Sequence, residues 1–124
     1  MEVTGMRAIR VFTVSYKSIR LKVRVMPHFK DVYLDMSGGV KWRMNKELPA
    51  GFFNPTKSPL AKYTGEVVLA GNSNLNVVVP HEVFHAVLHH FKTVNTEDDE
   101  PAAYAVGELT AKILRQLKYI TYAE

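Results

Sequence analysis

Residues 72–92 read NSNLNVVVPHEVFHAVLHHFK, and the spacing of apolar residues changes its period inside this stretch. Apolar side chains in its second half recur three and four positions apart, which is typical of an amphipathic helix. Pro80 lies near the predicted first turn, where a proline is tolerated because its missing N–H would have no helical partner. We therefore expect a helix that begins between Val77 and Pro80 and ends near Lys92.

The chain after this stretch predicts a second helix. Residues 96–100 form an acidic link, and the next residue, Pro101, is of a type that often opens a helix. Apolar residues then gather on one side as far as about Tyr119; they are Ala102, Ala103, Val106, Leu109, Ile113, Leu114 and Leu117. The C-terminal part of the chain therefore carries two consecutive amphipathic helices.

The chain before residue 72 has a period of two, which is typical of strands with one buried face. The alternation is clearest in residues 18–25, is also present in residues 9–13, and ends at Pro27. Residues 65–70 form a short apolar run between glycines and predict a further strand. The first half of the chain is therefore expected to form a sheet.

The segment between these strands gives a less regular pattern. Two apolar runs, 32–36 and 40–44, flank a Gly-Gly pair that can supply the positive φ of a tight turn, so we expect a hairpin. Residues 45–63 contain three prolines and predict no regular element. Phe52 and Phe53 are expected to hold this loop against the core, and the lining of a substrate groove is the alternative.

Together these elements predict an α+β fold. A mainly antiparallel, partly mixed sheet is expected from residues 7–70, followed by two helices packed on one of its faces. The chain has 124 residues, 47% of them apolar, which suits one domain. We expect a single domain over residues 1–124, with the sheet and loop in 1–76 and the two helices in 77–124.

Composition narrows the possible functions. The chain has no cysteine, so disulfides and thiolate metal sites are excluded, and any metal must be held by His, Asp or Glu. No run is apolar enough to cross a membrane and the first residues lack a signal-peptide core, so we expect a cytoplasmic protein without a membrane partner. Residues 1–62 carry a net charge of +8 and residues 63–124 a net charge of −4. A solvated basic sheet face is the favoured interpretation, and nucleic acid is the less favoured one.

The predicted first helix contains an HExxH motif formed by His81, Glu82 and His85. Residues four apart lie one turn apart on the same face of a helix, so both imidazoles can reach one metal ion. Zinc suits two His and one carboxylate, and Glu82 would then serve as the general base toward a water. A pair of surface histidines is the alternative, and His89 and His90 are expected to complement the helix dipole.

A third metal ligand can come from several acidic residues after the motif. These candidates are Glu97, Asp98, Asp99, Glu100 and Glu108. Glu100 lies at the start of the second helix and must reach back about two turns, roughly 11 Å, to His85. Glu108 would meet His85 more directly in a simple helical hairpin, so geometry leaves the two open.

The segments 80–89 (PHEVFHAVLH) and 99–107 (DEPAAYAVG) resemble the small zincin peptidase-like proteins of phages and mobile elements and, more remotely, ImmA/IrrE-type metallopeptidases. In such gluzincin-like families the third zinc ligand opens a Glu-x-x-Ala pattern on the next helix. The resemblance therefore implies Glu100 as the third ligand and Tyr104 as a group that orients a ligating histidine, with ordinary helix packing as the alternative for Tyr104. An oxyanion donor could come from any of four tyrosines, namely Tyr63, Tyr104, Tyr119 and Tyr122. These families also place an edge strand beside the motif helix, and residues 65–70 occupy that place in the chain.

These observations predict a zinc-dependent metallopeptidase-like protein. Its substrate would be a peptide or a protein, a single dedicated protein being one case. The peptide bond would be cleaved by a zinc-activated water with a Glu general base. The alternative is a regulatory or structural module of phage type without catalysis. That module would have a zinc-stabilised fold and a basic face for nucleic acid or protein.

Overall fold

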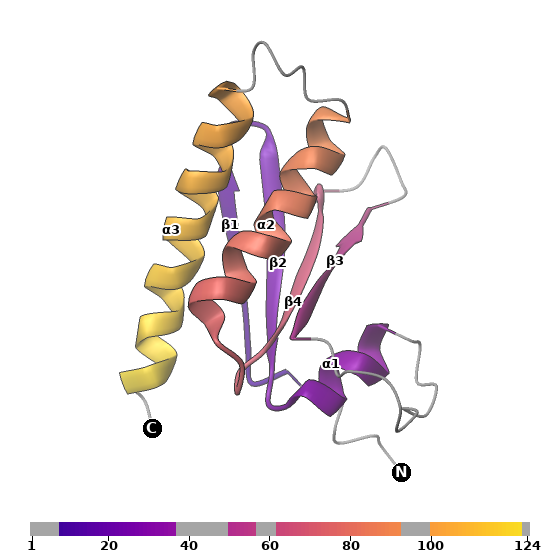
Figure 1. The fold of residues 1–124 in the computed structure, drawn as a ribbon, viewed down its shortest axis with the longest axis vertical. Helices are drawn as coiled ribbons and strands as arrows, with labels where there is room; N and C mark the ends of the chain where they lie inside the picture. Colours follow the sequence, from indigo (N-terminus) through magenta and orange to yellow (C-terminus); the bar gives the residue numbers. More distant parts are fainter. Residues whose placement is uncertain (1–7, 37–49, 57–61, 93–99, 123–124) are drawn as a thin grey trace.

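The computed structural model describes residues 8–36, 50–56, 62–92 and 100–122. A four-stranded sheet with strand order β1-β2-β4-β3 forms its centre. Figure 1 shows α2 and α3 side by side on one face of the sheet, while α1 lies near the end where β2 finishes. The fold is therefore α+β, as the sequence predicts.

The first two strands form an antiparallel hairpin. β1 spans Arg10–Tyr16 and β2 spans Ile19–Met26, with Tyr16 opposite Ile19 at the turn. Lys17 in this turn has a φ of 53°, in the left-handed region. The odd-numbered residues of β2 are all buried, because the period of two points them toward the helices. Both predicted strands are confirmed, and the first one continues further than its alternation indicates.

The predicted strand at 32–36 is wrong, because α1 spans Phe29–Met36. The amide of His28 donates a hydrogen bond of 3.0 Å to the carboxylate of Asp31, which is the reciprocal half of a capping box. This local cap closes a helical turn where the apolar residues alone suggested a hairpin. The expected second half of that hairpin, residues 40–44, lies outside the described residues.

The remaining two strands make the sheet mixed. β3 spans Gly51–Pro55 and pairs antiparallel with β4, which spans Gly65–Ala70 and runs parallel to β2. The strand predicted at 65–70 is confirmed, but the edge position expected for it is wrong, since β4 lies between β2 and β3. β3 occupies the edge instead, so the expectation of no regular element in residues 45–63 fails at 51–55.

Two clusters of buried side chains follow from the alternation of β4. Val67 and Leu69 face the main core under α2 and α3, whereas Val68 and Ala70 face a smaller core under α1. Both helices of the C-terminal part therefore pack on one face, as predicted. The small helix α1 on the opposite face is an addition that the sequence analysis did not anticipate.

The helix α2 spans Leu75–Phe91 and begins earlier than expected. Amides of its first turn donate to the carbonyl of Asn74, so Pro80 lies inside the helix. An interior proline costs about 3 kcal/mol. Burial of Val78 and Val79 against the sheet offsets this cost, at about 1.5–3 kcal/mol for each valine.

The helix α3 spans Glu100–Tyr122, which confirms the second predicted helix with one extra residue at its start and three at its end. Its buried side chains, Ala105, Leu109, Ile113 and Leu117, follow the spacing expected of an amphipathic face. Among the helices in the described ranges, none is long and apolar enough to span a membrane.

Candidate metal centre

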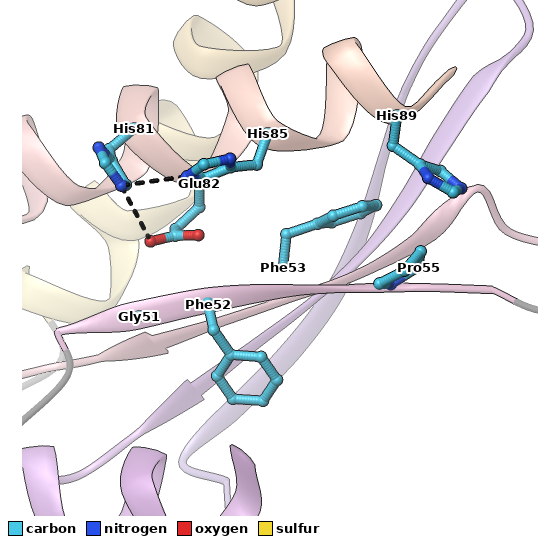
Figure 2. A pocket seen from close by; sticks show the side chains of 8 residues that line it. All are labelled: Gly51, Phe52, Phe53, Pro55, His81, Glu82, His85 and His89. Atoms are coloured by element: carbon cyan, nitrogen blue, oxygen red, sulfur yellow. Dashed lines mark hydrogen bonds and ion pairs between the residues drawn. The ribbon is translucent and has the colours of Figure 1, made fainter. Parts of the chain in front are cut away.

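The helix α2 brings the two histidines of the HExxH motif together. The Nε2 atoms of His81 and His85 are 3.3 Å apart, and their rings meet edge to face with centroids 4.8 Å apart. Both side chains are exposed at the surface, one turn apart on the same side of the helix (Figure 2). The helical spacing that the sequence indicates therefore produces a pair of converging imidazoles.

The separation of these nitrogens matches two corners of a tetrahedral zinc site. With zinc–nitrogen distances of about 2.0–2.1 Å, two tetrahedral ligand atoms lie roughly 3.3–3.4 Å apart. The same distance also suits a hydrogen bond between two neutral imidazoles, one donating and one accepting. His81 and His85 thus fit a shared cation with little rearrangement, and they also fit each other without one.

The side chain of Glu82 points toward β3, and its carboxylate lies between that strand and the imidazole pair (Figure 2). Its side chain is 8% exposed, and its Oε2 lies 4.0 Å from Nε2 of His81. Burial raises the pKa of the Glu82 carboxyl, and the neighbouring imidazoles oppose this to a smaller extent. A carboxylate held in this way is suited to accept and release a proton at the edge of the pocket.

Gly51 on β3 provides the room that Glu82 occupies. A Cβ at this position would lie 2.8 Å from the carbonyl oxygen of Val68 and 3.3 Å from Cγ of Glu82. Any larger residue would therefore push α2 away from the sheet edge or displace the carboxylate. The close approach of β3 and α2 sets the depth of the pocket.

The pocket has a volume of about 460 Å³ and lies between α2 and the edge strand. Figure 2 shows the ring of Phe53 pointing toward α2, while the ring of Phe52 points to the opposite side of β3. The ring centroids of Phe53 and His89 are 5.6 Å apart, so these two side chains line the far end of the pocket. His89 thus belongs to the pocket lining in addition to its place near the helix end.

The sequence analysis missed most of this pocket wall. It expected Phe52 and Phe53 to hold a loop against the core, and both residues do pack against the two cores. Phe53 also lines the pocket, so the groove that was the alternative exists as well. The signal for a strand was weak, because five residues between prolines show too little alternation for a clear period of two.

The acidic candidates on α3 lie elsewhere. Glu100, Tyr104 and Glu108 line a second pocket of about 240 Å³, which shares no residue with the pocket of His81. Figure 1 shows α3 on the β1 side of α2, and α3 contacts β1 while α2 contacts β3. The first pocket is lined by residues of α2 and β3. The described structure therefore does not group these carboxylates with the imidazoles.

Within the ranges that the structure describes, no three His, Asp or Glu side chains are grouped closely enough to hold a metal ion. Glu97, Asp98 and Asp99, the other candidates for a third ligand, fall outside those ranges. The described residues therefore supply two nitrogen ligands and an adjacent carboxylate, but not the complete ligand set.

Comparisons of the chain with models of protein families, with curated proteins and with solved structures give no match.

Proposed function

We propose that this protein is a zinc-dependent, metallopeptidase-like hydrolase with a zincin-like arrangement of its site. The observation that carries the proposal is the imidazole pair of His81 and His85, set 3.3 Å apart above the buried carboxylate of Glu82. Surface histidines that served only solubility would need neither this convergence nor the neighbouring pocket. The mixed sheet with an antiparallel strand beside the motif helix supports the zincin-like interpretation.

His81 and His85 would hold the zinc ion through their Nε2 atoms. Zinc supplies the polarisation that lets a water lose its proton near neutral pH. Glu82 accepts a proton from the attacking water and later delivers it to the nitrogen of the departing amine, so that water adds across the amide bond. The carboxylate of Glu82 is placed for both steps, because it borders the pocket 4.0 Å from Nε2 of His81.

For the third ligand we propose Glu100, which follows from the Glu-x-x-Ala pattern of the resemblance. In the described structure Glu100 is an exposed residue at the first position of α3. Glu108 remains the alternative, and Tyr104 remains the candidate oxyanion donor. The zinc content of Glu100→Ala and of Glu108→Ala distinguishes the two candidate ligands.

The edge strand β3 offers a way to hold a peptide. Within the described residues β3 pairs only with β4, so an extended segment can add along its other edge through main-chain hydrogen bonds. Such a segment would run past His81 and Glu82 toward Phe53 and His89. This arrangement favours an extended peptide or protein segment as the substrate, with an apolar side chain at the aromatic end of the pocket.

The decisive experiment compares the zinc-loaded protein with its Glu82→Gln variant on a mixture of unstructured peptides. We expect the variant to keep its zinc and to lose about 10²–10⁴-fold in hydrolysis rate, since only the proton transfer is removed. His90→Ala is the matched control on the same helix, outside the pocket lining, and should retain both zinc and catalysis. Equal rates for wild type and Glu82→Gln would overturn the hydrolytic proposal.

A non-catalytic, zinc-stabilised module is the second candidate, because the described residues provide only two ligands. This function predicts that zinc raises the unfolding temperature and that His85→Ala lowers it to the metal-free value. Glu82→Gln would then bind zinc as wild type does, and neither protein would hydrolyse peptides. The hydrolytic function and the non-catalytic function therefore predict different outcomes when wild type is compared with Glu82→Gln.

A further inference from the structure

The face of the sheet opposite to α2 and α3 carries a row of cations. Arg20, Lys22 and Arg24 occupy alternate positions of β2, so they point away from the main core. The helix α1 packs near the end of β2, in one cluster with Met26, and the opposite end of β2 carries Arg20. Arg20 is exposed, and Lys22 and Arg24 are half-buried.

The residues that lead into β4 extend this row. The Cζ atom of Arg20 lies 5.4 Å from the ring centroid of Tyr63, and the amide of Thr64 donates to the carbonyl of Arg20 at 2.7 Å. Tyr63 also has a side-chain hydrogen bond with Thr13 on β1, directly opposite Lys22. Segments that are far apart in the sequence therefore meet on one surface.

The electrostatics of Tyr63 reflect these neighbours. The hydrogen bond with Thr13 lowers the pKa of the Tyr63 phenol most, partial desolvation opposes it, and the charges of Lys62, Arg20 and Lys22 lower it further. A phenol surrounded by three cations marks a region of positive potential. We call the surface formed by Arg20, Lys22, Arg24, Lys62 and Tyr63 the basic sheet face.

The side chains that the structure describes leave the charges of Arg20, Lys22 and Lys62 without a paired carboxylate. Arg24 pairs with Glu66 at 2.9 Å. Among the other described carboxylate side chains, Asp31 caps α1, Glu82 lies in the pocket below His81, and Glu100 and Glu108 belong to α3. None of these described side chains makes an ion pair with Arg20, Lys22 or Lys62.

We propose that the basic sheet face binds single-stranded nucleic acid. Cations at alternate positions of a strand are about 7 Å apart, which is comparable with the spacing of successive phosphates along an extended single strand. The ring of Tyr63 and the guanidinium of Arg20 offer planar surfaces on which unpaired bases stack. An acidic peptide would use the charges but not these planar groups.

A duplex fits this surface less well than a single strand. The major groove admits a helix or a two-stranded ribbon, whereas the basic sheet face lies on β2, inside a four-stranded sheet, and on the residues that lead into β4. The face lies on the other side of the sheet from the candidate metal centre. Binding there therefore needs neither zinc nor Glu82, and its test is independent of the proposed function.

The test is fluorescence anisotropy of the full chain with labelled 12-residue oligo(dT) and oligo(U), between 50 and 200 mM salt. Three contacted phosphates predict a slope of log K against log salt of about −2, which is roughly a twentyfold weakening over this range. Arg20→Gln/Lys22→Gln should weaken binding at low salt by about tenfold or more and flatten the slope by about 1.4. Comparison of the two oligonucleotides shows whether the sugar is recognised.

The matched control is Arg115→Gln/Lys118→Gln, which removes the same two charges from α3 on the other side of the sheet. This variant should bind within about threefold of wild type with an unchanged slope. Tyr63→Leu should weaken binding by about fivefold or more while leaving the slope unchanged, because stacking releases no counterions. Circular dichroism of every variant checks that the fold is kept.

Three results would overturn the proposal. The first is the absence of binding to either oligonucleotide at 50 mM salt. The second is an equal loss in the two double variants, which would make the effect one of net charge alone. The third is tighter binding of a duplex or of an oligoglutamate of equal charge, which would assign the surface to a different partner.

Discussion

The pocket beside α2 and the pocket on α3 both contain glutamate and glycine, but only the first also contains histidines. In the first pocket, His81, Glu82 and His85 come from five consecutive residues, and a single helical turn brings them together. In the second, Glu100, Tyr104 and Glu108 share one side of α3, and no histidine reaches them. Side chains on one helix come close because of the helical period. Side chains on two helices come close only if the faces that carry them pack against each other.

The largest expected effect is a loss of zinc affinity. It tests whether a residue of the second pocket binds the same zinc ion as His81 and His85. His81→Ala or His85→Ala should weaken zinc binding by more than 100-fold, since loss of a ligand exceeds the 10–100-fold cost of losing a group that orients one. If Glu100 completes the site, Glu100→Ala should approach the same loss and Glu108→Ala should not. Elemental analysis after gentle purification and competition with a chromophoric chelator measure both.

The control for this series is His89→Ala, in which an imidazole is removed from the same pocket outside the motif. Equal zinc content in wild type and Glu100→Ala would remove Glu100 from the ligand set. A loss on Glu108→Ala alone would transfer the role to that residue. Full zinc binding by the His81→Ala and His85→Ala variants would refute the site itself.

The second effect compares one glycine from each pocket. Gly51→Ala places a methyl group 2.8 Å from the carbonyl oxygen of Val68 and close to Glu82, so β3 and α2 must separate. We expect a loss of about 1–3 kcal/mol in the free energy of unfolding, which is typical of overpacking. Urea denaturation of the metal-free protein measures this loss.

Gly107→Ala is the matched substitution in the second pocket and should have the opposite sign. Nothing lies within 4 Å of the added methyl group, and the position is inside α3. Alanine is favoured over glycine inside a helix by about 0.5–1 kcal/mol. If both substitutions change stability in the same direction, the close packing assigned to the first pocket is wrong.

The smallest effect concerns the pH dependence of the metal-free protein. Because burial raises the pKa of Glu82, the folded state binds this proton more tightly than the unfolded state does. The contribution of Glu82 to stability is therefore complete below its ordinary pKa and is lost as the pH rises through the raised value. Glu82→Gln should remove this loss and raise the unfolding temperature at neutral pH in the presence of a chelator.

Glu108→Gln supplies the comparison from the second pocket, since it neutralises an exposed carboxylate. We expect a negligible change in the unfolding temperature for this variant, measured by differential scanning fluorimetry from pH 4 to pH 8. If the metal-free Glu82→Gln protein is less stable than wild type at pH 7, the interactions of the ionised carboxylate outweigh the cost of its burial, and the prediction is wrong.

Local sequence patterns correctly predicted the helices and strands whose buried face can be identified from their own residues. The period of two in β2 and the period of three and four in α2 and α3 identify a buried face without knowledge of its partner. The hairpin expected at 32–44 failed at its first half because the carboxylate of Asp31 caps a helix there. The cap also depends only on neighbouring residues. The sequence therefore contained a helix signal at Asp31 as well as the turn signal of the Gly-Gly pair.

The sequence by itself determined the α+β class, the two long helices and the convergence of His81 with His85, because each depends on the repeat of one element. The tertiary structure alone decided that β3 takes the sheet edge, that α3 packs on the flank of α2 away from the pocket, and that Tyr63 joins the cations of β2. These arrangements depend on how surfaces far apart in the chain fit together, and no repeat within a single segment encodes such a fit.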